Sequence, residues 1–358
     1  MADYTTLPDF DAHEHVEFVD DPASGLKAII AIHSTHLGPA AGGTRFWRYA
    51  NADDAMRDAL RLSRGMSYKN AMAGLPMGGG KAVILAGADG RKTPEMLAAF
   101  GRAVERLEGR YVTAEDVGMS EADMVAIGRE TRHVCGLPVD EGEAGGDPGP
   151  FTAMGVFSGI KAAIGFRLGR SDLDGIHVAI QGVGSVGGGV ARQLAKAGAI
   201  ITLADIDTAR AAMVAGEVGA RVVSPDEIME VPCDVFSPNA LGAILDDDSI
   251  ARLDCAIVAG GANNQLARSG DGEQLARRGI LYAPDYVINS GGIINVSLEY
   301  LCRMKGESCT ADKVRERISC IPERLQEIWS GSADTGIAPD QVADRMAQEL
   351  IGRAQGAR

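Results

Sequence analysis

The stretch that decides the fold is Ile176-His177-Val178-Ala179-Ile180-Gln181-Gly182-Val183-Gly184-Ser185-Val186-Gly187. Its first half is a β-branched, largely apolar run, which is typical of a buried parallel strand. Residues 188–197 then have helical composition, and a second strand is expected over 199–203, before Ala204 and Asp205. Strand, glycine turn, helix, strand and acidic residue follow one another within about 30 residues, in the order that a dinucleotide-binding unit requires.

Each glycine of this turn has a physical role in that interpretation. Gly182 makes the tight turn, Gly184 lets the backbone approach a pyrophosphate, and Gly187 lets the helix pack on the strand. Ser185 and Val186 stand at the helix start, where free N–H groups and the helix dipole favour an anion. The turn therefore predicts a phosphate-binding site.

Polar residues follow the ends of the predicted strands. Asp205 lies about 20 residues after Gly184, where a carboxylate accepts hydrogen bonds from the adenosine ribose and repels a 2′-phosphate, so NAD is favoured over NADP. Further strands are expected over 234–236, 256–259 and 280–282. Asn239, Ala240 and Asn264 follow two of them and are candidate ligand contacts, although asparagines selected for turns are an equally good explanation.

The bulk properties narrow the class of protein. At 358 residues the chain is expected to form two domains, and its net charge of −14 argues against nucleic acid and anionic membranes as partners. No apolar run approaches the roughly 20 residues of a membrane span, and the N-terminus lacks the features of a secretory signal. The six scattered cysteines indicate reduced thiols and no metal site. We expect a cytoplasmic protein.

The first half of the chain holds two lysines of interest. A strand is expected over 25–33, as an edge strand and candidate interface, and a helix from about residue 53 to 65 or a little beyond, capped by Asn51. Lys69 would lie just past the end of that helix. A solvent-exposed lysine with no functional role is also stabilised there by the helix dipole. Lys81 stands between Gly80 and the apolar run 82–85, so it is expected to be buried, and a buried ammonium needs a purpose.

A carboxylate near these lysines would complete an acid–base site. Asp116 follows a predicted short strand at 110–112, and a carboxylate at a strand end can transfer protons. From the residues alone, Glu115 is as good a candidate, and a capping or turn role is as plausible for either.

Six segments, in order, resemble the amino acid dehydrogenase family that includes the glutamate, leucine, phenylalanine and valine enzymes. They are GPAAGGTR (38–45), GMSYKN (65–70), LPMGGGK (75–81), TAEDVG (113–118), ANNQL (262–266) and APDYVINSGG (283–292). The resemblance covers nearly the whole chain and is closest to the leucine and phenylalanine dehydrogenase branch.

The resemblance implies a role for each matched position. Lys69, helped by Asn264, would bind the substrate α-carboxylate. Lys81, with a lowered pKa, would activate the water that attacks the imine, and Asp116 would move protons among amine, water and carbinolamine. The further substrate positions implied are Ala41, Gly42, Gly43, Ala114, Ile293 and Val296, and Asn289 would join the cofactor contacts.

The resemblance also implies the fold and the reaction. An N-terminal α/β catalytic domain would span 1–139, with the C-terminal helix 333–358 packing back on it, and a Rossmann-like doubly wound NAD-binding domain would span 140–332. The enzyme would be a homo-oligomer that converts an L-amino acid, NAD and water reversibly into a 2-oxo acid, ammonia and NADH.

Substrate choice follows from three of these positions. Ala41, Ile293 and Val296 cannot pair with a distal carboxylate, so glutamate is disfavoured and an apolar side chain is favoured. Ala41 replaces the leucine common in leucine-specific members, which enlarges the pocket. Branched aliphatic substrates rank first and phenylalanine second.

Two other classes of protein are alternatives to an amino acid dehydrogenase. One is another Rossmann dehydrogenase, which would need a dedicated base such as histidine, and the other is a non-catalytic NAD-binding protein.

Overall fold

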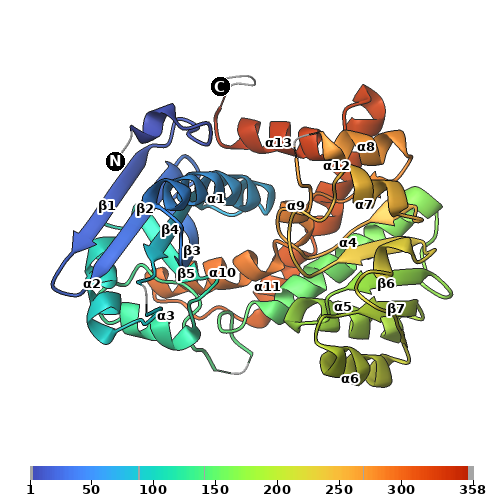
Figure 1. Cartoon of the computed structure of the whole chain (residues 1–358), viewed down its shortest axis with the longest axis horizontal. Coiled ribbons are helices and arrows are strands. Elements are labelled where there is room, and N and C mark those ends of the chain that lie inside the picture. The colour runs from blue at the N-terminus through green and yellow to red at the C-terminus, as the bar shows by residue number, and fades with distance from the viewer. Residues whose placement is uncertain (1–2, 88, 141, 269, 354–358) are drawn as a thin grey trace. The chain divides into compact units, whose positions relative to one another are not determined.

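The computed structural model describes residues 3–87, 89–140, 142–268 and 270–353 (Figure 1). The chain divides into two compact units. The first comprises Met1–Asp147, Ile293–Lys313 and Met346–Arg358, and the second comprises Pro148–Gly292 and Val314–Arg345. The first change of unit falls within segment 142–150, whose high content of glycine and proline is typical of a linker.

These units differ from the expected domains in the C-terminal third of the chain. Residues 293–313 belong to the first unit and residues 333–345 to the second. The physical reason in the first case is hydrogen bonding by helix α10, Gly291–Lys305. Glu299 accepts the Gly136 N–H at 3.1 Å, and Asn295 exchanges two hydrogen bonds with the backbone of Gly145.

A mixed five-stranded sheet forms the centre of the first unit. Its strands are β1 (His15–Asp21), β2 (Leu26–Ser34), β3 (Ala40–Trp47), β4 (Gly78–Leu85) and β5 (Tyr111–Glu115), in the order β1-β2-β4-β3-β5. β3 runs parallel to both β4 and β5, whereas β2 is antiparallel to β1 and β4. The expectation that β2 is an edge strand was therefore wrong, because β1 pairs along its whole length.

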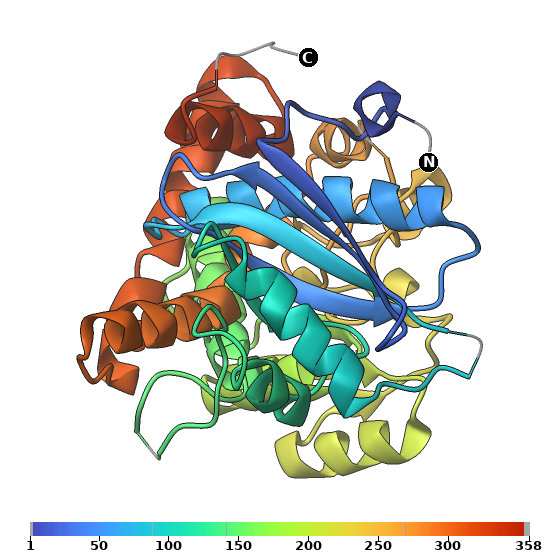
Figure 2. The same cartoon turned by 90° about the vertical axis from the view of Figure 1, so that its left-hand side faces the viewer.

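Helices cover both faces of this sheet (Figure 2). α1 (Ala52–Met72) lies on one face, and α2 (Pro94–Glu105) and α3 (Glu121–Ile127) lie on the other. Alternate residues of β2 feed the two apolar layers: Ile29 and Ala31 pack with α1, and Ile30 and Ile32 pack with α2. Short or terminal elements of the unit are η1 (Tyr4–Thr6) and parts of α11 (Ala311–Ile318) and α13 (Pro339–Leu350).

The first helix confirms its predicted start and corrects its predicted end. Asn51 caps it, and its side chain accepts the Asp54 N–H at 2.9 Å. The helix continues to Met72, so Lys69 lies in its last turn and not beyond it. The buried face persists through Ser67 and Tyr68, which explains why the helix does not stop at Gly65.

The second unit contains a six-stranded sheet in which every pairing is parallel. The strands are β6 (His177–Gln181), β7 (Ile200–Ala204), β8 (Arg221–Val222), β9 (Val235–Pro238), β10 (Ile257–Val258) and β11 (Leu281–Tyr282), in the order β11-β10-β9-β6-β7-β8. Strand order reverses between β6 and β9, as in a doubly wound dinucleotide-binding sheet. The predicted Rossmann-like fold is confirmed.

Helices connect the successive parallel strands of this unit. They are α5 (Ser185–Lys196), α6 (Thr208–Val218), η2 (Ile228–Glu230), α7 (Asp247–Arg252) and α8 (Asp271–Arg277), and the short helix α9 (Asp285–Ile288) follows the last strand. Ile250 and Leu253 from α7 and its C-cap, with Leu275 from α8, share one apolar core with Phe236 and Val258 of the sheet.

One helix is more apolar over its length than the sequence analysis expected. α4 (Gly149–Leu168) is long and apolar enough, by length and composition alone, to cross a membrane. It packs instead against α5 and α12 (Ile321–Thr335) inside the second unit. A Cβ atom added at Gly159 would lie 2.4 Å from Ile288 Cγ1 and 3.0 Å from Leu325 Cδ1, so one face of this helix is closely packed within the unit.

Two buried histidines of the first unit contact helix α1. His13 Nε2 is 3.0 Å from both the Leu60 carbonyl and Ser63 Oγ, and His33 Nδ1 is 2.7 Å from Ser67 Oγ. Burial lowers the pKa of His13 to about 4 and also lowers the pKa of His33, although Asp11 partly offsets the latter. The folded protein therefore binds these protons less readily than the unfolded chain.

This difference predicts acid-sensitive folding. A histidine whose folded pKa is depressed loses stability as pH falls from its unfolded pKa, near 6.5, toward its folded pKa. For His13 the loss between pH 7 and pH 4 is about 3 kcal/mol. Urea unfolding of His13→Gln should show a shallower pH dependence than the wild type. The exposed His36, changed to Gln, is the matched control, and an equal flattening there would contradict the assignment.

Candidate active site

The centre of the first unit holds a buried ion pair. Lys81 lies on β4 with only 7% of its side chain exposed, and its Nζ is 2.8 Å from Asp116 Oδ2. Asp116 is the first residue after β5, and β3 separates β5 from β4. The predicted burial of Lys81 is confirmed, and the structure places Asp116, not Glu115, beside it.

Burial and pairing act on these two groups in different ways. Burial lowers the pKa of the Lys81 ammonium, and the nearby Asp116 carboxylate offsets this only in part. Burial alone would raise the pKa of Asp116, but Lys81 and Arg45 together hold it below its usual value. The result is a lysine that loses its proton unusually easily, next to a carboxylate that stays ionised.

Two glycines of β3 make room for this pair. A Cβ atom at Gly42 would lie 1.9 Å from the Gly80 carbonyl oxygen, and one at Gly43 would lie 2.7 Å from Asp116 Cβ. Contacts within the protein thus require glycine at both positions, whether or not a substrate also approaches them. Tyr111 supports the same strand, because its hydroxyl donates to the Gly42 carbonyl at 2.7 Å.

The other expected substrate positions are spread over several elements, and three of them lie on β3, β5 and α1. Lys69 is half-buried in the last turn of α1, the helix that packs along β4. Ala41 is buried on β3 and pairs with Gly79, and Ala114 on β5 pairs with Gly43. Ile293 and Val296 lie on α10, half-buried and buried respectively, and Asn264 is an exposed residue of the second unit with φ +52°.

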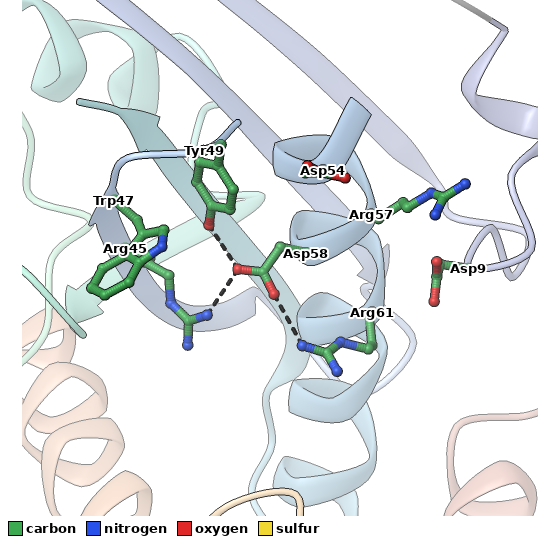
Figure 3. Close-up of a pocket in the computed structure, with 8 residues that line it drawn as sticks. All are labelled: Asp9, Arg45, Trp47, Tyr49, Asp54, Arg57, Asp58 and Arg61. Atoms are coloured by element: carbon green, nitrogen blue, oxygen red, sulfur yellow. Dashed lines mark hydrogen bonds and ion pairs between the residues drawn. The ribbon is translucent and has the colours of Figure 1, made fainter. Parts of the chain in front are cut away.

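Sequence reasoning missed two charged residues that extend this site. Arg45 lies on β3, and its Nε donates to Asp116 Oδ2 at 3.1 Å while its Nη1 donates to Asp58 Oδ2 at 2.8 Å. Asp58 lies on α1 and is drawn at the centre of Figure 3. The available signal was a charged residue inside an otherwise small and apolar strand, next to the glycines at 42 and 43.

The glycine turn of the second unit has the geometry of a phosphate-binding turn. Gly182 has φ +84°, and a Cβ at Gly187 would lie 2.0 Å from the Gly182 carbonyl oxygen, so both require glycine. Around Gly184, in contrast, no described atom lies within 4 Å of an added Cβ. No described side chain caps α5, which begins at Ser185 and continues through Val186. Its first N–H groups are therefore available to an anion.

Asp205 performs a structural task at the end of β7. Its Oδ2 accepts the Val183 N–H and its Oδ1 accepts the Asp207 N–H, each at 2.8 Å. Only 9% of the residue is exposed, and Arg210 Nη1 lies 3.7 Å from Oδ2. The carboxylate thus holds the glycine turn and places a negative charge beside it.

Two asparagines complete the expected cofactor contacts. Asn239, next to the exposed Ala240, accepts the Gly261 N–H at 2.9 Å. Asn289 is buried and donates to Asn263 Oδ1 at 2.8 Å. Its own Oδ1 has no hydrogen-bond partner among the described residues. A buried acceptor without a partner suits a ligand N–H group, so the residues of this unit fit a dinucleotide with a carboxamide.

Comparison with known proteins identifies the family. The family model described as Glu/Leu/Phe/Val dehydrogenase, dimerisation domain, matches residues 13–133, and the model described as Glutamate/Leucine/Phenylalanine/Valine dehydrogenase matches residues 202–356. The chain belongs to the Glu/Leu/Phe/Val dehydrogenase family. It is an amino acid dehydrogenase, an oxidoreductase of a pyridine-nucleotide-dependent family that acts on CH–NH2 groups.

Individual relatives of this amino acid dehydrogenase cover almost its full length. It is 44% identical to a leucine dehydrogenase of Bacillus subtilis over 97% of this chain and 93% of the relative. It is 44% identical to a valine dehydrogenase of Streptomyces virginiae over 96% of this chain and 95% of the relative. The crystal structure of L-tryptophan dehydrogenase from Nostoc punctiforme matches with a TM-score of 0.83, at 42% identity over 95% of this chain and 96% of that one.

The close contact at Gly43 predicts a selective loss of activity. In Gly43→Ala the new Cβ would lie 2.6 Å from the Glu115 carbonyl oxygen and 2.7 Å from Asp116 Cβ, so Asp116 must move. We expect kcat to fall by about a hundredfold, because misplacement of a reacting group by about 1 Å has that effect. Gly65→Ala on α1, where no described atom lies within 4 Å, is the matched control and should keep wild-type kcat. Equal kcat values in the two variants would contradict this account.

The open space at Gly184 predicts a selective loss of cofactor binding. In Gly184→Ala the added Cβ contacts no described atom, so thermal stability without cofactor should be unchanged. The methyl group would instead occupy the path of the pyrophosphate, and we expect the Kd for NADH, measured by fluorescence titration, to rise at least about tenfold. Gly216→Ala on α6, also open, is the control. Unchanged NADH binding in Gly184→Ala would place the dinucleotide elsewhere.

Proposed function

We propose that this enzyme catalyses the reversible, NAD-dependent oxidative deamination of an apolar L-amino acid, with leucine or another branched-chain residue preferred. The amino acid, NAD and water become the 2-oxo acid, ammonia and NADH. The observation that carries the proposal is the buried Lys81–Asp116 pair, with Nζ 2.8 Å from Oδ2. When bound, the cofactor supplies the acceptor for the hydride from the α-carbon, and the chain itself must manage carboxylate, water and protons.

In this proposal the charged residues of the first unit divide the work. Lys69 binds the substrate α-carboxylate, a role that Asn264 is proposed to share. Because its pKa is lowered by burial, Lys81 can take a proton from the water that attacks the substrate imine. Asp116 moves protons between the nitrogen and oxygen atoms of the resulting carbinolamine. The lysine ammonium then stabilises the oxyanion that develops as ammonia leaves.

The proposed cofactor contacts lie in the second unit. Gly182, Gly184 and Gly187 would receive the pyrophosphate at the start of α5. The buried charge of Asp205 disfavours a 2′-phosphate, which supports NAD over NADP. The unpartnered Oδ1 of Asn289 would accept a hydrogen bond from the nicotinamide carboxamide.

The proposed specificity rests on what the side-chain pocket lacks. Ala41, Ile293 and Val296 offer no charge to pair with the distal carboxylate of glutamate, and burying that carboxylate unpaired would be costly. The small Ala41 leaves room for a larger substrate. Phenylalanine or another aromatic amino acid is therefore the second candidate, and similarity to L-tryptophan dehydrogenase supports keeping it.

The proposal extends to the setting of the enzyme. The first family model is described as a dimerisation domain, which supports a homo-oligomer. Among the described strands of the first sheet, β1 is the partly exposed edge, because the outer edge of β5 is covered by residues 133–135. β1 therefore replaces β2 as the candidate contact. A net charge of −14 and free cysteines agree with a cytoplasmic enzyme that binds neither nucleic acid nor membranes.

A substrate panel tests the proposed function. NADH formation would be followed at mildly alkaline pH with leucine, isoleucine, valine, phenylalanine, tryptophan and glutamate. We expect the highest kcat/KM with a branched-chain substrate, and loss of about a thousandfold or more in Lys81→Met. The Lys81→Met variant should still bind NADH. Preference for glutamate would overturn the specificity proposal, and a fully active Lys81→Met variant would remove Lys81 from the mechanism.

A further inference from the structure

Arg45 joins two carboxylates that belong to different elements of the first unit. Its Nε donates to Asp116 Oδ2 at 3.1 Å, and its Nη1 donates to Asp58 Oδ2 at 2.8 Å. Asp116 Oδ2 is also the oxygen that Lys81 Nζ approaches at 2.8 Å. Asp116 Oδ2 is thus in contact with two cationic groups, Lys81 and Arg45. Of these two, Arg45 also binds Asp58 and so links Asp116 to α1.

Asp58 is in turn fixed by three donors. Besides Arg45, its Oδ2 accepts from the Tyr49 hydroxyl at 2.7 Å, and its Oδ1 accepts from Arg61 Nη2 at 3.1 Å. Figure 3 shows these side chains directed at Asp58 from the end of β3 and from α1, on the wall of a cavity of about 380 Å³. The Asp58 side chain is only 11% exposed, so its charge is mostly shielded from solvent.

We propose that Arg45, anchored by Asp58, is a positioning residue that fixes the orientation of Asp116 for proton transfer and sets the pH range in which the Lys81–Asp116 pair works. This inference rests on the proposed function of that pair. A planar guanidinium can donate to two carboxylates in fixed directions, whereas a lysine ammonium at the same place would be a single point charge.

The charge of Arg45 acts on both members of the pair in the same direction. Burial is the largest influence on both groups, and it lowers the pKa of Lys81 but raises that of Asp116. Arg45 lowers both, the pKa of Lys81 by repulsion and that of Asp116 by attraction. Asp58 on α1 also acts on Lys81 and raises its pKa, as Asp116 does more strongly. Loss of Arg45 should therefore raise the pKa of both groups.

The direct test is the pH profile of kcat/KM for amino acid oxidation in Arg45→Met. Oxidation requires the deprotonated lysine, so a higher pKa moves the acidic limb of the profile to higher pH. At a pH below that limb, kcat/KM should fall about tenfold for each unit of displacement, and most of the loss should be recovered at alkaline pH. Arg45→Lys keeps the charge but not the two-point contact. Its limb should stay near that of the wild type, while kcat falls.

Arg61→Met is the matched control. Arg61 also donates to Asp58, but its side chain is 53% exposed and no contact joins it to Asp116 among the described ion pairs. We expect its pH profile to match the wild type. An unmoved limb in Arg45→Met, or an equal displacement in Arg61→Met, would overturn the inference. If Arg45→Met does not fold, the kcat of Arg45→Lys tests the inference instead. A wild-type kcat in Arg45→Lys would overturn the role proposed for Arg45.

Failure of this inference differs visibly from failure of the proposed function. A wild-type enzyme that oxidises none of the amino acids removes the function itself. An active wild type whose Arg45 variants keep the wild-type profile removes only the role of Arg45.

Discussion

The burial of one ammonium group constrains much of the first unit. Lys81 lies inside a sheet, where an unpaired charge is strongly unfavourable, so Asp116 must lie at hydrogen-bonding distance. That contact requires the end of β5 to approach β4 across β3, and the approach leaves no space for a side chain at Gly43. The same need for a partner applies to the next charges along the network. Arg45 pairs with Asp116, and Asp58 pairs with Arg45.

The second unit follows a different constraint, which is the exposure of N–H groups to an anion. Gly182 and Gly187 are dictated by the turn itself, whereas Gly184 has open space around it. Asp205 links this turn to the end of β7 through the Val183 N–H. A single carboxylate therefore stabilises the turn and supplies the charge that is proposed to exclude a 2′-phosphate. The proposed cofactor choice would therefore be coupled to local stability at this position.

Local features were predictable from the sequence, and features that depend on register were not. The glycine turn and the cap at Asn51 depend on neighbouring residues, so their patterns were sufficient. The interior position of β2 was missed because β1 breaks the strict alternation of apolar and polar residues and ends in two adjacent acidic residues, which gives a weak strand signal. Arg45 was missed because its contacts with Asp58 and Asp116 appear only once β3 has been placed beside β5 and α1.

The most direct test of this account measures the pKa of the Lys81 ammonium. Competitive acetylation across a pH series, with mass spectrometry of each lysine peptide, compares Lys81 with exposed lysines of the same chain. Burial predicts a lower pKa for Lys81, and removal of the neighbouring negative charge in Asp116→Asn predicts a further fall. A Lys81 that titrates with the exposed lysines, or that does not respond to Asp116→Asn, would contradict the claim that this buried pair is the centre of the active site.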